Sequence, residues 1–147
     1  MNARCSPRLS NVGLKKAYIY IDGAARGNPG PAGAGVIIYL NDDEHRISKY
    51  LGVKTNNEAE YHALIMALEA VYKLGVRDVV VHSDSELLVK QMRGEYRVRN
   101  ERIRELFEKA SKMASEFDSF EIIHVGREDN RGADKLANDA IDSAPAP

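Results

Sequence analysis

Residues 17–30, AYIYIDGAARGNPG, constrain the fold most, because they join an apolar run to an acid and then to a tight turn. Side chains alternate between two faces along a strand, so Tyr18, Tyr20 and Asp22 would share one face. Asp22 then lies at the carboxyl end of a central strand, the edge at which open α/β sheets bind ligands. The alternative interpretation is that Asp22 and Gly23 form only a turn signal.

The bulk composition predicts one globular domain. The chain has 147 residues, of which 44% are hydrophobic and 29% charged. Its one cysteine, Cys5, excludes a disulfide framework and a thiolate-rich metal site. We expect no membrane span and no secretory signal, because the sequence contains no long apolar run and residues 1–16 contain no apolar core, so a cytoplasmic location is predicted. The net charge of −1 gives no global indication of a nucleic-acid partner.

The first half of the chain predicts three strands and a helix. Strands are expected at residues 17–22, 34–40 and 45–53, paired as an antiparallel meander, with the glycine-rich residues 23–35 as a turn. A helical stripe then runs from Tyr61 to Tyr72, and Gly75 is a typical helix stop. The helix would be the crossover that brings the next strand parallel to the first.

The second half predicts two more strands among three helices. Residues 78–84, DVVVHSD, form a strand buried on both faces, and residues 120–125 form the last strand. Helices are expected at residues 85–93 and 100–117, with a final amphipathic helix between Ala133 and Ile141. Residues 1–16 are predicted to be a flexible N-terminal segment, residues 17–142 the domain, and residues 143–147 a disordered tail.

Three further acids each have an ordinary structural explanation. Glu60 could cap the following helix together with Asn57, and Thr55 with Glu58 offers a second capping register. Asp84 suits the positive end of a helix dipole, with a capping box between Ser83 and Glu86 as a further option. Asp134 lies in the first turn of the last helix and has the same explanation.

Together the acids indicate a metal site. If the first and fourth strands are parallel neighbours, Asp22 and Asp84 end side by side, and the start of the last helix could bring Asp134 to the same place. Crowded carboxylates repel one another unless a cation neutralises them. Ligation by oxygen alone favours Mg²⁺ or Mn²⁺, and two such ions could assist a phosphoryl displacement.

Four motifs in this order closely resemble type 1 ribonuclease H over residues 17–141. They are Asp-Gly-x-x-x-Gly-Asn-Pro-Gly, Thr-Asn-Asn-x-x-Glu, Ser-Asp-Ser and Asn-x-x-x-Asp-x-Leu-Ala. The resemblance implies an α/β ribonuclease H-like fold, a mixed five-stranded sheet of order 3-2-1-4-5 flanked by helices. It implies that Asp22, Glu60, Asp84 and Asp134 are the metal-binding and catalytic acids, and it leaves Glu58 outside the site.

The resemblance also implies an activity, hydrolysis of the RNA strand of RNA/DNA hybrids by two metal ions, leaving 3′-hydroxyl and 5′-phosphate ends. Asn28, Thr55, Asn56 and Asn57 resemble the family's substrate contacts, and short polar side chains suit a 2′-hydroxyl. Turn and cap chemistry is the alternative for these residues.

Two departures from the family pattern are visible. Many bacterial members have a mobile histidine shortly before the last acid, whereas here His124 is predicted inside the last strand. Arg127 is better placed in the loop, so we assign it the catalytic role at the scissile phosphate or in product release, and treat His62 and His82 as structural. The basic protrusion of some members is absent, which makes this a short form.

An arginine-rich segment remains between residues 93 and 104, and two interpretations stay open for it. The arginines are either a solvated helix face or a reduced phosphate-binding patch. They are Arg93, Arg97, Arg99, Arg102 and Arg104.

We therefore predict a monomeric ribonuclease H that uses Mg²⁺ or Mn²⁺, two ions in the active complex, and binds an RNA/DNA hybrid duplex without a membrane or an obligate protein partner. One alternative is a two-metal nuclease or integrase of related fold that acts on DNA. The other is a nucleic-acid-binding module without catalysis.

Overall fold

A computed structural model of the chain describes residues 16–145, so the predictions for residues 1–15 and 146–147 lie outside the described residues. The strands are β1 (Ala17–Ala25), β2 (Gly30–Leu40), β3 (Asp43–Lys54), β4 (Asp78–Ser83) and β5 (Ser119–His124). The helices are α1 (Asn56–Lys73), α2 (Glu86–Met92), α3 (Glu101–Ala114) and α4 (Arg131–Asp142), with a short 3₁₀ helix at Arg127–Asp129.

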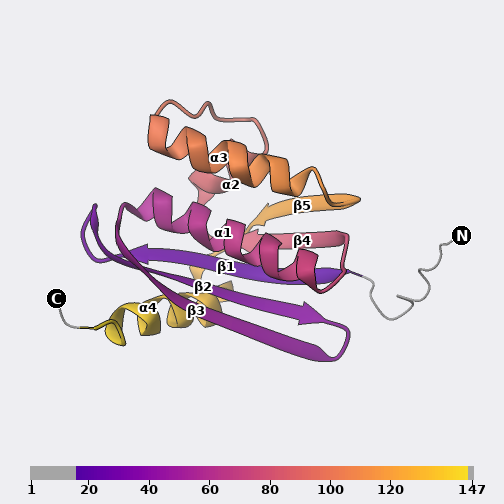
Figure 1. Ribbon diagram of the computed structural model, residues 1–147, viewed down its shortest axis with the longest axis horizontal. Coiled ribbons are helices and arrows are strands. Elements are labelled where there is room, and N and C mark those ends of the chain that lie inside the picture. Colours follow the sequence, from indigo (N-terminus) through magenta and orange to yellow (C-terminus); the bar gives the residue numbers. More distant parts are fainter. Residues whose placement is uncertain (1–15, 146–147) are drawn as a thin grey trace, which may run out of the picture.

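The five strands form one mixed sheet of order β3-β2-β1-β4-β5, as predicted (Figure 1). β1 pairs antiparallel with β2, and β2 with β3, whereas β1 and β4 are parallel, as are β4 and β5. In the parallel pair, Ile21 lies opposite Ser83, and in the antiparallel pair Asp22 lies opposite Gly35. The chain therefore places the residues after Ile21 and Ser83 at the same edge of the sheet.

Helices cover both faces of the sheet. α1 and α3 pack together on one face, whereas α4 lies across β1, β2 and β3 on the other (Figure 1). The core lies under α1, where Ile19 and Ile21 of β1 meet Leu64 and Leu68, all with no exposed surface. The opposite face of β1 carries Tyr18, which is exposed, so the predicted alternation of this strand is confirmed.

The glycine-rich segment is mostly strand, which corrects the prediction of a turn over residues 23–35. β1 continues to Ala25 and β2 begins at Gly30, so the connection itself is short. Two of the glycines lie within β2, facing α4. A Cβ atom at Gly33 would lie 2.3 Å from the backbone oxygen of Ala137, and one at Gly35 would lie 2.2 Å from that of Ala133. These glycines let the helix approach the sheet closely, a use that sequence pattern alone does not distinguish from turn formation.

The other elements agree with the prediction apart from their ends. α1 stops before Gly75, which has φ +86° as a helix stop requires. α3 ends at Ala114 rather than at residue 117. Of the predicted tail the structure describes residues 143–145, in which Ser143 caps α4 and its backbone N–H donates to the carbonyl of Asp139. Among residues 16–145 no helix combines the length and apolar character that a bilayer span requires.

Candidate metal centre

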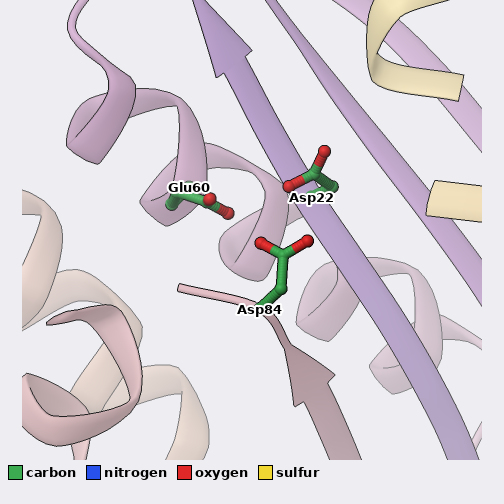
Figure 2. Close-up of side chains that lie close together, drawn as sticks. All are labelled: Asp22, Glu60 and Asp84. Atoms are coloured by element: carbon green, nitrogen blue, oxygen red, sulfur yellow. The ribbon is translucent and has the colours of Figure 1, made fainter. Parts of the chain in front are cut away.

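Three acids from three elements meet at the carboxyl ends of β1 and β4. Asp22 follows Ile21 in β1, Asp84 follows the last residue of β4, and Glu60 projects from the second turn of α1. Each offers a carboxylate oxygen within 4.8 Å of the other two, and their side chains point toward one another (Figure 2). We call Asp22, Glu60 and Asp84 the acid cluster.

Glu60 is fixed by a backbone contact with β1. Its Oε1 accepts a hydrogen bond from the backbone N–H of Gly23 at 3.0 Å, although the two residues are 37 positions apart. A side chain at Gly23 would collide with α1, since a Cβ atom there would lie 2.2 Å from the carbonyl carbon of Ala59. The glycine after Asp22 therefore allows the helix to bring Glu60 against the strand that carries Asp22.

Glu58, rather than Glu60, forms the capping box at the start of α1. The Thr55 hydroxyl accepts from the Glu58 N–H at 3.1 Å, and Glu58 Oε1 accepts from the Thr55 N–H at 2.9 Å. Burial alone would raise the pKa of Glu58, but these hydrogen bonds and the charges of Lys54 and Arg102 lower it below its ordinary value. The capping register is Thr55 with Glu58, and the alternative with Asn57 is wrong, which leaves Glu60 for the cluster.

The electrostatics of the cluster favour a bound cation. Asp22 and Glu60 are only 5% and 8% exposed. Burial raises the pKa of Asp22 far above its ordinary value of 3.8, and the charges of Glu60 and Asp84 raise it further. Burial and the charge of Asp84 likewise raise the pKa of Glu60, although the Gly23 hydrogen bond and Arg127 oppose this. Carboxylate oxygens alone form the cluster, a donor set that fits hard cations such as Mg²⁺ and Mn²⁺.

Asp134 lies near the acid cluster but outside it. It is an exposed residue in the first turn of α4, and it lines the same open cavity of about 750 Å³ as Asp22, Glu60 and Asp84. Its Oδ1 accepts a hydrogen bond from Nδ2 of Asn138 at 3.2 Å. The structure therefore brings three of the four predicted acids into mutual contact range. It places the fourth at the wall of their cavity, within hydrogen-bonding reach of Asp22, whose pKa it raises further.

Asn130 is a buried neighbour of the site for which the sequence assigned no role. It is 1% exposed, and its Nδ2 donates to the carbonyl of Ile21 at 2.9 Å and to Oδ2 of Asp84 at 3.3 Å. It precedes α4 without capping it through its side chain. The Asn-x-x-x-Asp motif contained this residue, but no local pattern indicates its contact with Asp84, which lies 46 positions earlier in the chain.

The second predicted capping box is also wrong. Ser85, not Ser83, caps α2, because its hydroxyl accepts from the Leu88 N–H at 3.2 Å. The hydroxyl of Ser83 instead accepts from the Ser85 N–H at 3.0 Å. Asp84 thus lies between two residues that are held by hydrogen bonds, just before the helix begins.

The predicted substrate-contacting asparagines join two loops beside the cluster. Oδ1 of Asn28 accepts from the Asn56 N–H at 3.0 Å, and Oδ1 of Asn56 accepts from the Ala25 N–H at 3.1 Å. Asn28 and Asn56 are exposed, and their amide nitrogens are the groups they can offer to a ligand. The side-chain oxygen of Asn57 is buried without a hydrogen-bond partner. Asn28 and Asn56 can therefore have both roles, because the side-chain oxygen makes the structural hydrogen bond and the amide nitrogen can donate to a substrate.

The arginine-rich segment divides into two groups. All five arginines are exposed, but two of them donate to backbone carbonyls. Nε of Arg93 donates to the carbonyl of Ile122 in β5, and Nη2 of Arg104 donates to that of Val98. The other three are Arg97, Arg99 and Arg102, of which Arg102 lines a cavity of about 280 Å³ together with Thr55 and Asn100.

The loop before α4 is where the sequence departs from the family's mobile histidine. Arg127 lines the cavity of the acid cluster, whereas His124 is the exposed last residue of β5. The ring of His82 stacks on Tyr20 with centroids 4.2 Å apart, and its Nδ1 lies 2.9 Å from the carbonyl of Ile19. His82 thus has the packing of a structural residue.

Comparisons with known proteins agree with this geometry. The family model described as Reverse transcriptase-like matches residues 20–140. The protein named Ribonuclease HI from Halobacterium salinarum is 40% identical over 131 residues, covering 88% of this chain and 66% of that protein. The Bifunctional protein Rv2228c from Mycobacterium tuberculosis is 40% identical over 132 residues, covering 88% of this chain and 36% of that protein. The chain therefore spans about a third of the length of this mycobacterial relative.

Solved structures are similar over almost the same range. RNase H1 from Halobacterium salinarum superposes with a TM-score of 0.84 at 40% identity, covering 88% of this chain and 99% of that one. LC11-RNase H1, crystallised in complex with an RNA/DNA hybrid, has a TM-score of 0.81 at 44% identity, covering 86% of this chain and 96% of that one. The family match begins within β1 and ends within α4, and it includes the other elements and the acid cluster.

Proposed function

The chain belongs to the type 1 ribonuclease H family, and we propose that it is a metal-dependent endonuclease that hydrolyses the RNA strand of RNA/DNA hybrids. The observation that carries this proposal is the acid cluster, in which three carboxylates from distant parts of the chain lie within 4.8 Å. Two of these carboxylates are buried and have strongly raised pKa values. Such perturbed groups are typical of functional sites, and bound cations would neutralise their negative charges. The likeness to a protein solved with an RNA/DNA hybrid supports the substrate class.

The residues of the site divide the work of holding ions and substrate. Asp22, Glu60 and Asp84 would hold the ions, and Asp134 would complete the set from α4. Two bound Mg²⁺ or Mn²⁺ ions would activate the attacking water and stabilise the leaving 3′ oxygen, giving 3′-hydroxyl and 5′-phosphate ends. The Gly23 N–H holds Glu60, and the Asn130 amide holds Asp84, in the orientation that this requires.

Substrate selection would come from the loops beside the cluster. Asn28 and Asn56 present amide nitrogens, and Thr55 and Asn57 lie at the start of α1, Thr55 as its N-cap and Asn57 in its first turn. Such donors suit the 2′-hydroxyl and phosphate oxygens that distinguish RNA from DNA. The exposed Arg97, Arg99 and Arg102 would add salt-sensitive contacts to phosphates. Arg127, on the cavity wall, would contact the scissile phosphate or help the product leave.

A cleavage assay on an end-labelled RNA/DNA hybrid tests the proposal. We expect cleavage in Mg²⁺ or Mn²⁺, none in chelator, and loss of cleavage by Asp84→Asn with an unchanged circular dichroism spectrum and thermal midpoint close to wild type. Near-wild-type turnover by this variant would refute the site assignment. An all-DNA duplex of the same sequence is the control for a DNA nuclease, and hybrid binding without cleavage in either ion would indicate a non-catalytic module.

Two features remain predictions. Action as a monomer without an obligate protein partner is checked by light scattering during size-exclusion chromatography, which should give one chain per particle under assay conditions. The cytoplasmic location is checked by fractionation of the source cells.

A further inference from the structure

We propose that Arg26 and Asn138 are positioning residues that hold the carboxylate of Asp134 at the wall of the cavity. The inference rests on the proposed function, because it concerns how the fourth acid of that site is oriented. Arg26 belongs to the connection between β1 and β2, and Asn138 lies one turn after Asp134 in α4. Neither residue was a candidate in the sequence.

Asp134 needs an external support more than the other acids do. Asp22 and Glu60 are buried, and Glu60 is fixed by the Gly23 N–H. Asp84 accepts a hydrogen bond from the buried amide of Asn130. Asp134 is exposed, and its neighbour in the cluster is Asp22, which it reaches through a side-chain hydrogen bond. Two ionised carboxylates repel each other, so Asp22 cannot hold Asp134 in place once both are charged.

Asn138 supplies that support from the next turn of the helix. Its Nδ2 donates to the backbone oxygen of Asp134 at 3.0 Å and to Oδ1 of the same residue at 3.2 Å. One amide nitrogen therefore ties the carboxylate to the helix backbone. Of the two carboxylate oxygens, the bond to Asn138 uses Oδ1.

Arg26 fixes which way the Asn138 amide faces. Nη2 of Arg26 donates to Oδ1 of Asn138 at 3.2 Å. A guanidinium can only donate and a carboxylate can only accept, so a flip of the amide would break its bonds to Arg26 and Asp134 at once. The bonds thus form a directed chain from Arg26 through Asn138 to Asp134.

The chain of bonds is anchored at its Arg26 end. Nη1 of Arg26 also pairs with Oδ1 of Asp142 at 2.6 Å, and this hydrogen bond lowers the pKa of the Asp142 carboxyl below its ordinary value. Asp134, Asn138 and Asp142 are spaced four residues apart, so they form one row along α4. Arg26 spans the last two, and its own backbone N–H donates to the Pro31 carbonyl at 2.8 Å. The row is therefore tied to the loop that carries Asn28.

These contacts are exposed, so we expect their removal to change metal affinity more than folding stability. Exposed ion pairs contribute little to folding stability, so removal of either side chain should leave the fold intact. Partners that orient metal-binding groups have a larger effect on metal affinity, by about tenfold or more. The metal dependence of the protein, rather than its stability, should report the loss of Asn138.

The test compares Asn138→Ala, Arg26→Ala and the double variant. For Asn138→Ala we expect a rise of about tenfold in the Mg²⁺ concentration that gives half-maximal cleavage of a labelled hybrid. The KM for the hybrid at saturating Mg²⁺ should stay within about twofold. Because Arg26 acts through Asn138, the double variant should be no worse than Asn138→Ala. Asp139→Asn, which alters the adjacent side chain and its pair with Lys135, is the matched control and should behave as wild type.

A second readout does not depend on cleavage. In ¹⁵N-labelled protein without substrate, a titration with Mn²⁺ should broaden the backbone amide resonance of Asp134 at a higher ion concentration in Asn138→Ala than in wild type. Wild-type Mg²⁺ dependence together with a wild-type Mn²⁺ titration would overturn the inference, and additive effects of the two substitutions would overturn the relay through Asn138. If wild type fails to cleave the hybrid in either ion, the proposed function fails, and the Mn²⁺ titration still decides whether Asn138 positions Asp134.

Discussion

The backbone N–H of Gly23 donates to Oε1 of Glu60 at 3.0 Å, so the strand that carries one acid directly holds a second acid on the neighbouring helix. The contact requires that α1 lie against β1 with no side chain between them, since a Cβ atom at Gly23 would lie 2.3 Å from the Glu60 backbone nitrogen. Gly23 therefore both permits the close packing of α1 on β1 and orients the carboxylate of Glu60.

Gly23→Ala should therefore impair both folding and catalysis. The added methyl must push α1 away from β1, which we expect to lower the free energy of unfolding by about 1–3 kcal/mol and to reduce cleavage at least about tenfold. Urea unfolding and hybrid cleavage measure the two effects. Gly52→Ala is the control, because its methyl meets no atom within 4 Å but its φ of +79° makes it strained. It should lose stability and keep activity, and equal loss of activity in both variants would contradict the prediction.

Asp22→Asn should stabilise the metal-free protein while abolishing cleavage. The pKa of Asp22 is raised in the folded state, so the folded protein binds more protons than the unfolded chain above pH 3.8. The free energy of unfolding of the wild type therefore falls as pH rises through this window, and the substitution removes that loss. We expect a gain of about 1–2 kcal/mol near pH 8 in chelator, shrinking toward pH 4.

Saturating Mg²⁺ should reverse this order, since an ion bound only by the folded wild type raises its stability. Thermal unfolding in chelator and in Mg²⁺, at several pH values, gives both comparisons. A variant less stable than wild type in chelator at pH 8 would show that the buried carboxylate is not under repulsion.

Glu58 and Glu60 should separate stability from activity. Glu58→Ala removes one half of the capping box, so we expect a loss of about 1 kcal/mol in the free energy of unfolding with cleavage retained. Glu60→Gln keeps an acceptor for the Gly23 N–H but removes the charge, so cleavage should fall steeply while the fold stays as stable or gains stability. Urea unfolding and hybrid cleavage are measured on both variants. If Glu58→Ala lost cleavage and Glu60→Gln lost only stability, Glu58 would be the site residue and Glu60 the capping residue.

Arg127 and His124 can be compared in the same way. Arg127 lines the cavity and its charge acts on Glu60, whereas His124 is exposed at the end of β5. We expect Arg127→Ala to lower kcat about tenfold, equivalent to about 1.4 kcal/mol, and His124→Ala to leave it within about twofold. Single-turnover and steady-state cleavage rates show whether the loss lies in chemistry or in product release. A larger decrease in kcat for His124→Ala than for Arg127→Ala would show that the histidine, not the arginine, assists catalysis or product release.

The residue patterns predicted the type of each of the five strands and four helices, and the resemblance to the family supplied the order of the strands in the sheet. Alternation in β1, the three valines of β4 and the apolar stripe of α1 each select one element type, and the crossover rule then fixes the parallel pairing. The motif glycines were harder to interpret. Gly33 and Gly35 belong to a glycine-rich segment that is typical of a turn, but they lie in strand β2. The absence of side chains there lets α4 pack close to the sheet, and a local sequence pattern does not indicate such packing.

The candidate site was predictable in its acids but not in their supports. Asp22, Asp84 and Glu60 follow from strand ends and a motif. The amides of Asn130 and Asn138 depend on side-chain directions that are fixed only once α4 packs on the sheet. The choice between Thr55 and Asn57 as the helix cap likewise needed coordinates, because both registers satisfy the same spacing rule.

The alignment of β1 with its neighbours has a practical consequence. Asp22 lies opposite Gly35 in β2, and the preceding residue, Ile21, lies opposite Ser83 in β4. A slip of one residue in either pairing would turn the carboxylate toward the hydrophobic interior and the isoleucine toward water. Misaligned molecules would therefore be inactive even if their circular dichroism were normal. Specific activity per mole of chain can thus serve as a quality measure for refolded preparations, one that spectroscopy of helix content cannot replace.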